Sequence, residues 1–200
     1  MCRVGIIGGT FDPIHLAHIY IAEEAKKKLN LDKVIFMPAG IQPLKTDKKV
    51  TEASLRLEMV QKAIEGKIGF EVSDYEIKKE GKSYTYKTLE HFYKEYKDLY
   101  FITGADCLLG IDKWKEIDKI FSLCKFVVFT RPGYNNNELV NKKRFVEEKY
   151  NGDIILLEVP GIHISSTEIR EKIINNEKVD DILPAVVLDI IKEKGLYREH

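Results

Sequence analysis

The chain has 200 residues, of which 44% are hydrophobic, 10% aromatic and 32% charged. This balance is typical of a folded globular protein and excludes general disorder, which combines low hydrophobicity with a high net charge. Lysine and arginine together number 32, as do aspartate and glutamate, so the formal net charge is zero. A general nucleic-acid-binding protein usually has a basic excess, and this composition therefore argues against one.

Two features of the sequence indicate its compartment. It contains no apolar run long enough to form a transmembrane helix, and its glycine-interrupted start does not resemble a signal peptide. The three cysteines, Cys2, Cys107 and Cys124, are scattered without the spacing of metal ligands, which is typical of reduced thiols. We therefore expect a cytoplasmic protein that binds neither nucleic acid nor a membrane, and the sequence leaves its oligomeric state open.

Short apolar segments alternate along the chain with segments of helical periodicity. The predicted strands span residues 3–7, 33–37, 70–77, 99–102, 126–129 and 154–159. The predicted helices span residues 16–29, 51–65, 85–97, 114–123, 138–150, 167–174 and 182–194. Several strands are continuous apolar runs, which indicates burial on both faces. The pattern predicts an α/β fold in one domain over residues 1–200, with an open parallel sheet and helices on both faces. Ligands bind beyond the carboxyl ends of the strands in such sheets.

The first candidate site follows the first strand. Gly8 and Gly9 let main-chain N–H groups approach an anion closely, and the following helix start offers a partial positive charge. His15 and His18 lie on one face of the first helical turn and can donate hydrogen bonds to developing negative charge. Two other interpretations remain open: an ordinary strand–helix turn, or metal ligation by Asp12 with the two histidines, which no further His or Cys cluster supports.

The second candidate site lies near the other end of the chain. Ser165 and Ser166 precede a predicted helix, where their hydroxyls and the exposed amides can cap the helix or hold a phosphate. Arg170, one turn further on, adds a positive charge. A plain capping sequence, with Glu168 in the first turn, is the alternative interpretation.

Both segments resemble motifs of the nucleotidylyltransferase superfamily, whose fold is Rossmann-like. The first resembles its histidine-containing signature, with Ala17 where a glycine is usual between the histidines: Gly9-Thr10-Phe11-Asp12-Pro13-x-His15-x-x-His18. The second resembles its Ile-Ser-Ser/Thr motif with a following arginine, which is assigned there to ATP phosphates: Ile164-Ser165-Ser166-Thr167-Glu168-Ile169-Arg170. Two motifs in the right order near opposite ends of the chain make a chance match implausible.

The segments between these motifs resemble bacterial nicotinate-nucleotide adenylyltransferases. They are Pro38-Ala39-Gly40-x-x-Pro43-x-Lys45, Ser83-Tyr84-Thr85-x-x-Thr88-Leu89, Phe101-Ile102-x-Gly104-x-Asp106, Trp114 and Arg131-Pro132-Gly133. The resemblance spans most of the chain, and the Ser83–Leu89 segment is its most discriminating part. It implies that the chain transfers an adenylyl group from ATP to nicotinate mononucleotide, giving deamido-NAD and pyrophosphate. It also implies Mg²⁺ held mainly by the ATP phosphates, without a metal site in the protein.

The resemblance assigns roles to matching residues. The expected catalytic residues are His18, His15 and Lys45. The expected ATP-binding residues are Gly8, Gly9, Thr10, Phe11, Gly104, Asp106, Ile164, Ser165, Ser166 and Arg170. The expected residues for nicotinate mononucleotide are Lys45, Thr85, Trp114 and Arg131.

Simpler roles remain open for several of these residues. Taken singly, Lys45 fits a solvated loop, Trp114 a core position, Asp106 a helix cap and Arg131 a surface turn. At the level of the whole chain, the alternatives are a sister transferase with nicotinamide mononucleotide or phosphopantetheine as acceptor, a nucleotide-binding module without catalysis, and a metal hydrolase.

The sequence also predicts a preference between the acid and amide acceptors. The Thr85 hydroxyl and the N–H groups of the helix that begins there can donate to a carboxylate. No acidic residue lies between Ser83 and Leu89 to accept a hydrogen bond from a carboxamide. We therefore expect nicotinate mononucleotide to be preferred over its amide.

Overall fold

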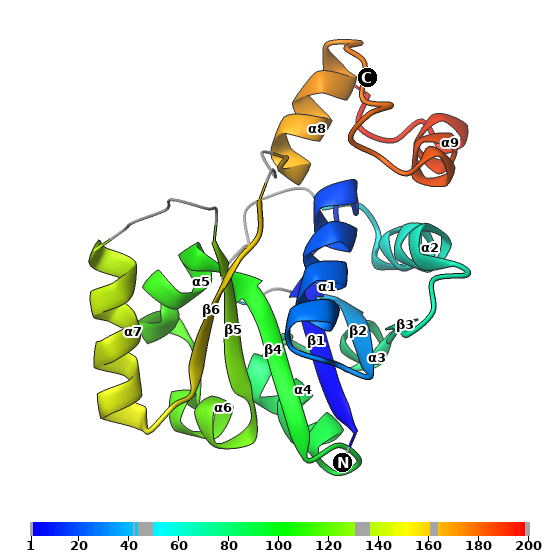
Figure 1. Ribbon diagram of the computed structural model, residues 1–200. Helices are drawn as coiled ribbons and strands as arrows, with labels where there is room; N and C mark the ends of the chain where they lie inside the picture. Colours follow the sequence, from blue (N-terminus) through cyan, green and yellow to red (C-terminus); the bar gives the residue numbers. More distant parts are fainter. Residues whose placement is uncertain (1, 42, 44–49, 131–136, 161–163, 199–200) are drawn as a thin grey trace.

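The computed structural model describes residues 2–41, 43, 50–130, 137–160 and 164–198, and its parallel sheet has the strand order β3-β2-β1-β4-β5-β6 (Figure 1). The strands are β1 (Arg3–Gly9), β2 (Lys33–Pro38), β3 (Phe70–Val72), β4 (Asp98–Gly104), β5 (Lys125–Thr130) and β6 (Ile154–Glu158). Successive strands run outward from β1 to one edge and then from β4 to the other edge. This reversal between β1 and β4 is the position where doubly wound sheets bind ligands.

The helices are α1 (Leu16–Lys28), α2 (Ala53–Ile64), α3 (Tyr75–Lys78), α4 (Thr85–Tyr93), α5 (Ala105–Leu109), the 3₁₀ helix η1 (Ile111–Lys113), α6 (Ile117–Leu123), α7 (Asn137–Tyr150), α8 (Ser166–Ile174) and α9 (Ala185–Glu193). Within the described ranges, no helix has the length and apolar character needed to cross a membrane.

Two hydrophobic cores lie on opposite faces of the sheet. Alternate strand residues supply each core, because successive side chains in a strand point to opposite faces. Ile7 and Ile102 belong to the core that also contains buried residues of α1, α2 and α9. Ile6 and Phe101 belong to the core that contains buried residues of α4, α5, α6 and α7. The predicted α/β sheet with helices on both faces is therefore confirmed.

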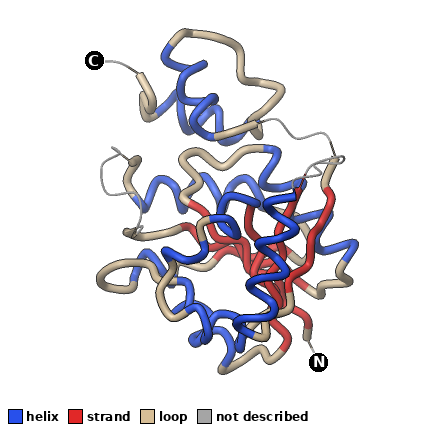
Figure 2. The backbone as a smooth tube through the Cα atoms, turned by 90° about the vertical axis from the view of Figure 1, so that its left-hand side faces the viewer, coloured by secondary structure: helices blue, strands red, loops and turns tan. Residues whose placement is uncertain are grey.

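The C-terminal helices α8 and α9 lie beyond the carboxyl ends of the strands in both views of the backbone (Figures 1 and 2). The main-chain N–H of Leu16, at the start of α1, donates to the carbonyl oxygen of Ile182 at 3.1 Å. The segment between α8 and α9 thus contacts the start of α1, which follows the loop after β1.

The predicted helix 85–97 ends at Tyr93 and the predicted helix 182–194 begins at Ala185, and two further predicted elements differ in their organisation. The predicted strand 70–77 ends at Val72 and is followed by α3, because the apolar alternation changes phase after Val72. The predicted helix 114–123 begins only at Ile117, and the preceding residues form the short helices α5 and η1. Each of these helices is too short to show the repeating apolar spacing that predicts a helix.

Candidate active site

A cavity of about 230 Å³ lies at the carboxyl ends of β1 and β4. Its lining residues are Gly8, Gly9, Ala39, Pro43, Glu76, Ser83, Tyr84, Thr85, Phe101, Thr103, Cys107, Lys113, Trp114, Lys115 and Ile120. A Cβ at Gly9 would lie 3.0 Å from the Phe11 ring, so any other residue there would require that ring to shift. The two glycines therefore bring the main chain of β1 directly to the cavity wall.

The two histidines of the first motif are packed against each other at the start of α1. Their rings are stacked, with centroids 3.7 Å apart, and the His18 and Phe11 rings meet edge to face, with centroids 5.0 Å apart. The main-chain N–H of His15 donates to Nδ1 of His18 at 3.3 Å. Because Nδ1 is the acceptor, a neutral His18 carries its proton on Nε2, which leaves Nε2–H as a donor.

Burial keeps both imidazoles neutral near pH 7. It lowers the pKa of His15 to about 4, and Glu168 opposes this effect weakly. Burial, and secondarily the neighbouring His15, hold the pKa of His18 well below its usual value. Nδ1 of His15 and the hydroxyl of Thr10 are buried without a hydrogen-bond partner among the described residues.

Asp12, the acidic residue of this motif, has hydrogen-bond partners within the protein. Tyr197, near the end of the described chain, donates its hydroxyl to Oδ1 at 2.7 Å, and the N–H of Thr51 donates to Oδ2 at 3.3 Å. Among the described residues, no three His, Cys, Asp or Glu side chains gather in a way that could hold a metal ion. The arrangement does not support a metal site formed by Asp12, His15 and His18.

Ser165 and Glu168 form a reciprocal cap at the start of α8. The Ser165 hydroxyl accepts from the N–H of Glu168 at 3.2 Å, and the Glu168 carboxylate accepts from the N–H of Ser165 at 2.9 Å. This capping box satisfies two groups at the helix terminus. The capping interpretation of this segment is therefore confirmed for these two residues.

Other residues of the second motif contact the first motif directly. The Ser166 hydroxyl donates to the carbonyl oxygen of Pro13 at 2.9 Å, and Nη1 of Arg170 donates to that of Asp12 at 2.7 Å. The two motifs, distant in sequence, therefore form one continuous structure at the carboxyl end of the sheet.

Arg56, which the sequence analysis did not identify, connects three segments around the site. It is 2% exposed, and its guanidinium donates to the carbonyl oxygens of Thr10, Ala39 and Thr51 at 2.6, 2.8 and 2.9 Å. Burial lowers its pKa, and the charge of Asp12 opposes this change. The sequence contains one indication that Arg56 is buried: it lies three residues before Met59, on the same face of α2.

The opposite wall of the cavity is aromatic and basic. Trp114 packs edge-on against Phe101 and Phe126, at centroid distances of 6.0 Å in both cases. It lies in the cavity lining, and its predicted role beside the acceptor stays a prediction. Thr85, the first residue of α4, lies in the same lining, and Lys115 places its ammonium 5.2 Å from the centre of the Tyr84 ring.

The cavity also contains a carboxyl group that the sequence analysis missed. Glu76, from α3, lies in the lining, and its Oε1 accepts a hydrogen bond from the Thr88 hydroxyl at 2.5 Å. Burial raises its pKa, while hydrogen bonds from Thr88 and Ser83 oppose the rise. Glu76 lies outside the Ser83–Leu89 segment, in a different element, so the sequence of that segment does not indicate it.

The structure leaves several expected residues away from this lining. Gly104 ends β4, and Asp106 is exposed in the first turn of α5, just beyond that strand. Ile164 packs against the core beside α8. Lys45 and Arg131 lie outside the described residues, so their predicted roles are untested.

Comparison with known proteins gives a consistent result. The cytidylyltransferase-like family model matches residues 6–172. A protein of Clostridium botulinum (strain Eklund 17B / Type B), named probable nicotinate-nucleotide adenylyltransferase, is 56% identical over 199 residues and covers 100% of both chains. A relative of the same name from Clostridium beijerinckii is 55% identical over 204 residues, covering 99% of this chain and 100% of the relative. The chain belongs to the nicotinate-nucleotide adenylyltransferase family.

A solved structure agrees with this assignment at the level of the fold. Plasmodium falciparum nicotinic acid mononucleotide adenylyltransferase, complexed with NaAD, has a TM-score of 0.77 and 23% sequence identity, and the match covers 98% of each chain. The relatives of more than 50% identity confirm the family resemblance drawn from the motifs, and the chain is a nucleotidyltransferase.

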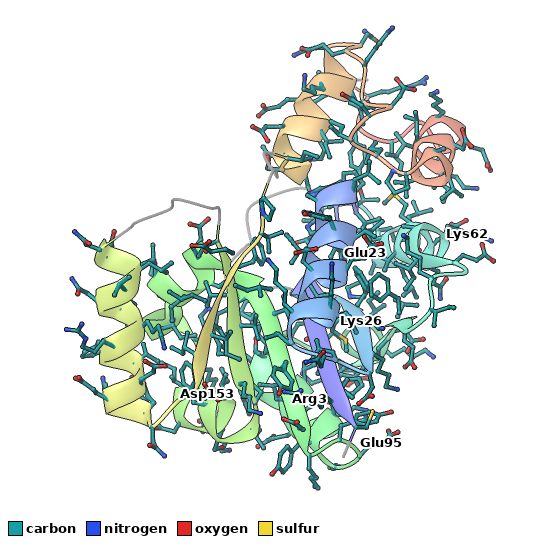
Figure 3. The ribbon with its side chains drawn as sticks, viewed as in Figure 1. Arg3, Glu23, Lys26, Lys62, Glu95 and Asp153 are labelled. Carbon is teal, nitrogen blue, oxygen red and sulfur yellow. The ribbon has the colours of Figure 1, made fainter. Side chains whose placement is uncertain are left out.

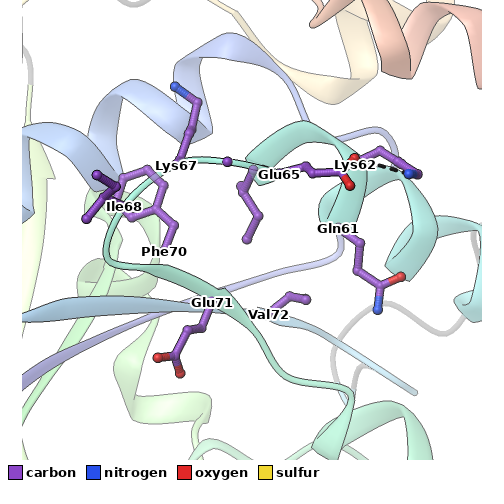
Figure 4. A pocket seen from close by; sticks show the side chains of 10 residues that line it. Gln61, Lys62, Glu65, Lys67, Ile68, Phe70, Glu71 and Val72 are labelled. Carbon is purple, nitrogen blue, oxygen red and sulfur yellow. Dashed lines mark hydrogen bonds and ion pairs between the residues drawn. The ribbon is translucent and has the colours of Figure 1, made fainter.

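Other surface features lie away from this candidate site. A hollow of about 630 Å³ lies beside β3. Figure 4 shows its lining, in which Lys62, Glu65 and Glu71 are among the labelled residues. Arg3 lies at the amino end of the sheet (Figure 3). Neither location contains a residue of the two motifs, so the cavity at the carboxyl end of the sheet is the candidate active site.

Proposed function

We propose that this enzyme transfers the adenylyl group of ATP to nicotinate mononucleotide, with release of pyrophosphate, in NAD biosynthesis. The observation that carries this proposal is the meeting of the two motifs beside a cavity lined by Trp114 and Thr85. ATP would lie along the motif junction, and the pyridine ring would stack on Trp114, since flat aromatic side chains favour such packing.

The reaction requires no covalent enzyme intermediate. A phosphate oxygen of nicotinate mononucleotide attacks the α-phosphorus of ATP and forms a new P–O bond. The bond from the α-phosphorus to the oxygen that bridges to the β-phosphorus breaks, and pyrophosphate leaves with that electron pair. Because the nucleophile is already an anion, positioning and stabilisation of charge supply most of the catalysis.

In this proposal, the chain's own residues hold the phosphates. The Nε2–H of His18 donates to an oxygen of the reacting phosphate, and His15 contacts the same chain of phosphates. Gly8, Gly9, Thr10 and Phe11 frame the adenylate, and Gly104 and Asp106 lie toward its ribose. The departing pyrophosphate lies along a surface formed by Ile164, Ser165, Ser166 and Arg170. Lys45 would approach the triphosphate, and Arg131 an anionic group of the acceptor.

In this proposal Mg²⁺ is bound through ATP and not through a metal site formed by the protein. Both carboxylate oxygens of Asp12 accept hydrogen bonds from Tyr197 and Thr51, so this side chain is not available as a ready metal ligand. Mg²⁺ is often held by substrate phosphates and water, and it would neutralise charge on the triphosphate there. We also propose a cytoplasmic location, since Cys2, Cys107 and Cys124 form no disulfide with one another.

A pyrophosphate-release assay tests the proposal. ATP and Mg²⁺ are supplied with nicotinate mononucleotide, nicotinamide mononucleotide or phosphopantetheine in parallel reactions. We expect the highest kcat/KM with nicotinate mononucleotide. A higher value with phosphopantetheine would identify a sister transferase, and ATP binding without pyrophosphate release from any acceptor would identify a binding module.

A further inference from the structure

Glu76 places a carboxyl group in the wall of the proposed acceptor cavity. Among the described lining residues it is the only Asp or Glu, and it shares the wall with Ser83 and Thr85. A carboxylate in this place would disfavour an anionic acceptor by repulsion and favour a carboxamide by accepting its N–H. It therefore opposes the expected preference for the acid.

Thr88 engages this carboxyl group. Its hydroxyl lies 2.5 Å from Oε1 of Glu76, and the residue itself is only 1% exposed. Thr85 and Thr88 are three residues apart in α4, so they lie on the same face of its first turn. The Glu76 carboxyl group is thus held on the helical face that presents the Thr85 hydroxyl.

Ser83 also forms hydrogen bonds in this part of the cavity wall. Its hydroxyl oxygen accepts a hydrogen bond from the N–H of Gly40 at 3.1 Å, and it also hydrogen-bonds to Glu76. Gly40 is packed against the main chain of α3, because a Cβ there would lie 2.3 Å from the carbonyl oxygen of Glu76. The side chain of Glu76 is consequently fixed by its neighbours and does not turn freely into the cavity.

We propose that Thr88 is a specificity-determining residue. Its hydroxyl donates a hydrogen bond to the Glu76 carboxyl group, so this group does not accept one from the carboxamide of nicotinamide mononucleotide. This inference rests on the proposed function, because it concerns the choice between two acceptors of that reaction. With the carboxyl group engaged, the groups left to face the pyridine substituent are donors such as the Thr85 hydroxyl and the N–H groups at the start of α4.

The test compares Thr88→Val with Thr88→Ser in the full-length enzyme. Valine has nearly the shape of threonine without the hydroxyl, whereas serine keeps the hydroxyl. We expect Thr88→Val to lower kcat/KM for nicotinate mononucleotide and raise it for the amide, so that the acid-to-amide ratio falls by at least about fivefold. Thr88→Ser should keep the wild-type ratio within about twofold. A structural defect alone would lower both values together.

A double variant completes the test. Because Glu76→Gln removes the carboxylate, the combination Thr88→Val/Glu76→Gln should not show the fall in ratio that Thr88→Val shows. Thr88→Val that lowers kcat/KM for both mononucleotides equally, or a double variant with the same ratio as Thr88→Val, would overturn the inference. If Thr88→Val fails to fold, as judged by circular dichroism, Thr88→Ala replaces it in the same comparison: its acid-to-amide ratio should also fall below that of the wild type, and an unchanged ratio overturns the inference. A wild-type enzyme inactive with both mononucleotides would instead refute the proposed function.

Discussion

The guanidinium of Arg170 lies 2.7 Å from the main-chain carbonyl oxygen of Asp12, across 158 positions of sequence. The neighbouring contact from Ser166 to Pro13 and the hydrogen bond from Tyr197 to Asp12 join the same two regions. The loop that carries His15 is therefore shaped by residues from the end of the chain. Substitutions in α8 should alter the first motif as well as any phosphate bound at the second.

Arg170→Ala should weaken ATP binding and also destabilise the protein. It removes a cation beside the proposed triphosphate path and a charge-assisted hydrogen bond to Asp12, which is worth about 1.5–3 kcal/mol. For a chain of this size the melting temperature should fall by several degrees, at roughly 2–4 °C per kcal/mol. Calorimetry with ATP and a thermal melt measure the two effects. Unchanged ATP affinity in a folded Arg170→Ala variant would contradict the proposed role.

His18→Ala should lower kcat by about 10²-fold or more, the scale expected when one donor to developing charge is lost. ATP binding should change much less, because the interaction strengthens in the transition state. His91→Ala is the matched control, since His91 is an exposed imidazole stacked on Tyr75, outside the cavity lining. Turnover of the His18 variant within a few-fold of the control would refute the assignment.

The sequence predicts those parts of the site that local physics dictates. A continuous apolar strand followed by Gly8-Gly9 and a helix places the first motif at the carboxyl end of the sheet, and the structure agrees. Ser165 and Glu168 have the spacing of a capping box and form one. These features depend on residues that are close together in the chain, so their pattern is visible without the fold.

Other parts of the site depend on long-range packing. Arg56 reaches Thr10 over 46 positions, and Tyr197 reaches Asp12 over 185 positions. The sequence around Arg56 or Tyr197 does not indicate which residue it contacts. Glu76 was missed for a related reason: the segment 70–77 was predicted to be one strand, which would have pointed alternate side chains to opposite faces. Helix α3 instead turns Glu76 toward Thr88.

Arg56→Met should impair both substrates together. The side chain donates to the loops that follow β1 and β2, and its loss leaves the carbonyl oxygens of Thr10, Ala39 and Thr51 without this donor. A buried polar group without a partner costs about 1–3 kcal/mol, so the free energy of unfolding should fall by several kcal/mol. The KM values for ATP and for nicotinate mononucleotide should both rise, since the two loops border both proposed subsites.

Lys62→Met is the matched control for Arg56→Met. Lys62 also lies on α2, but its exposed ammonium pairs only with Glu65 among the described residues. Exposed pairs of this kind contribute little, and stability should change by no more than about 0.5 kcal/mol. Urea unfolding and initial-rate kinetics of both variants provide the comparison. Equal stability of the two variants would show that the three hydrogen bonds of Arg56 do not hold the loops.

His15 should make the stability of the protein depend on pH in the acid range. In the unfolded chain its pKa is about 6.5, whereas burial lowers it to about 4 in the folded protein. Below pH 6.5 the unfolded chain therefore binds a proton that the folded protein does not, and the free energy of unfolding falls as the pH is lowered toward 4. Below that pH both states are protonated, and this contribution no longer changes.

The size of the effect follows from the same two pKa values. Between pH 7.5 and pH 5.0, His15 alone should lower the free energy of unfolding by about 2 kcal/mol. His15→Asn removes the titrating imidazole, while His18, Glu76 and the other titrating groups remain. The difference in stability between wild type and His15→Asn should therefore shrink by about 2 kcal/mol over this interval, as measured by urea unfolding at the two pH values. A difference that stays constant with pH would mean that the folded protein accepts a proton on His15 as readily as the unfolded chain does.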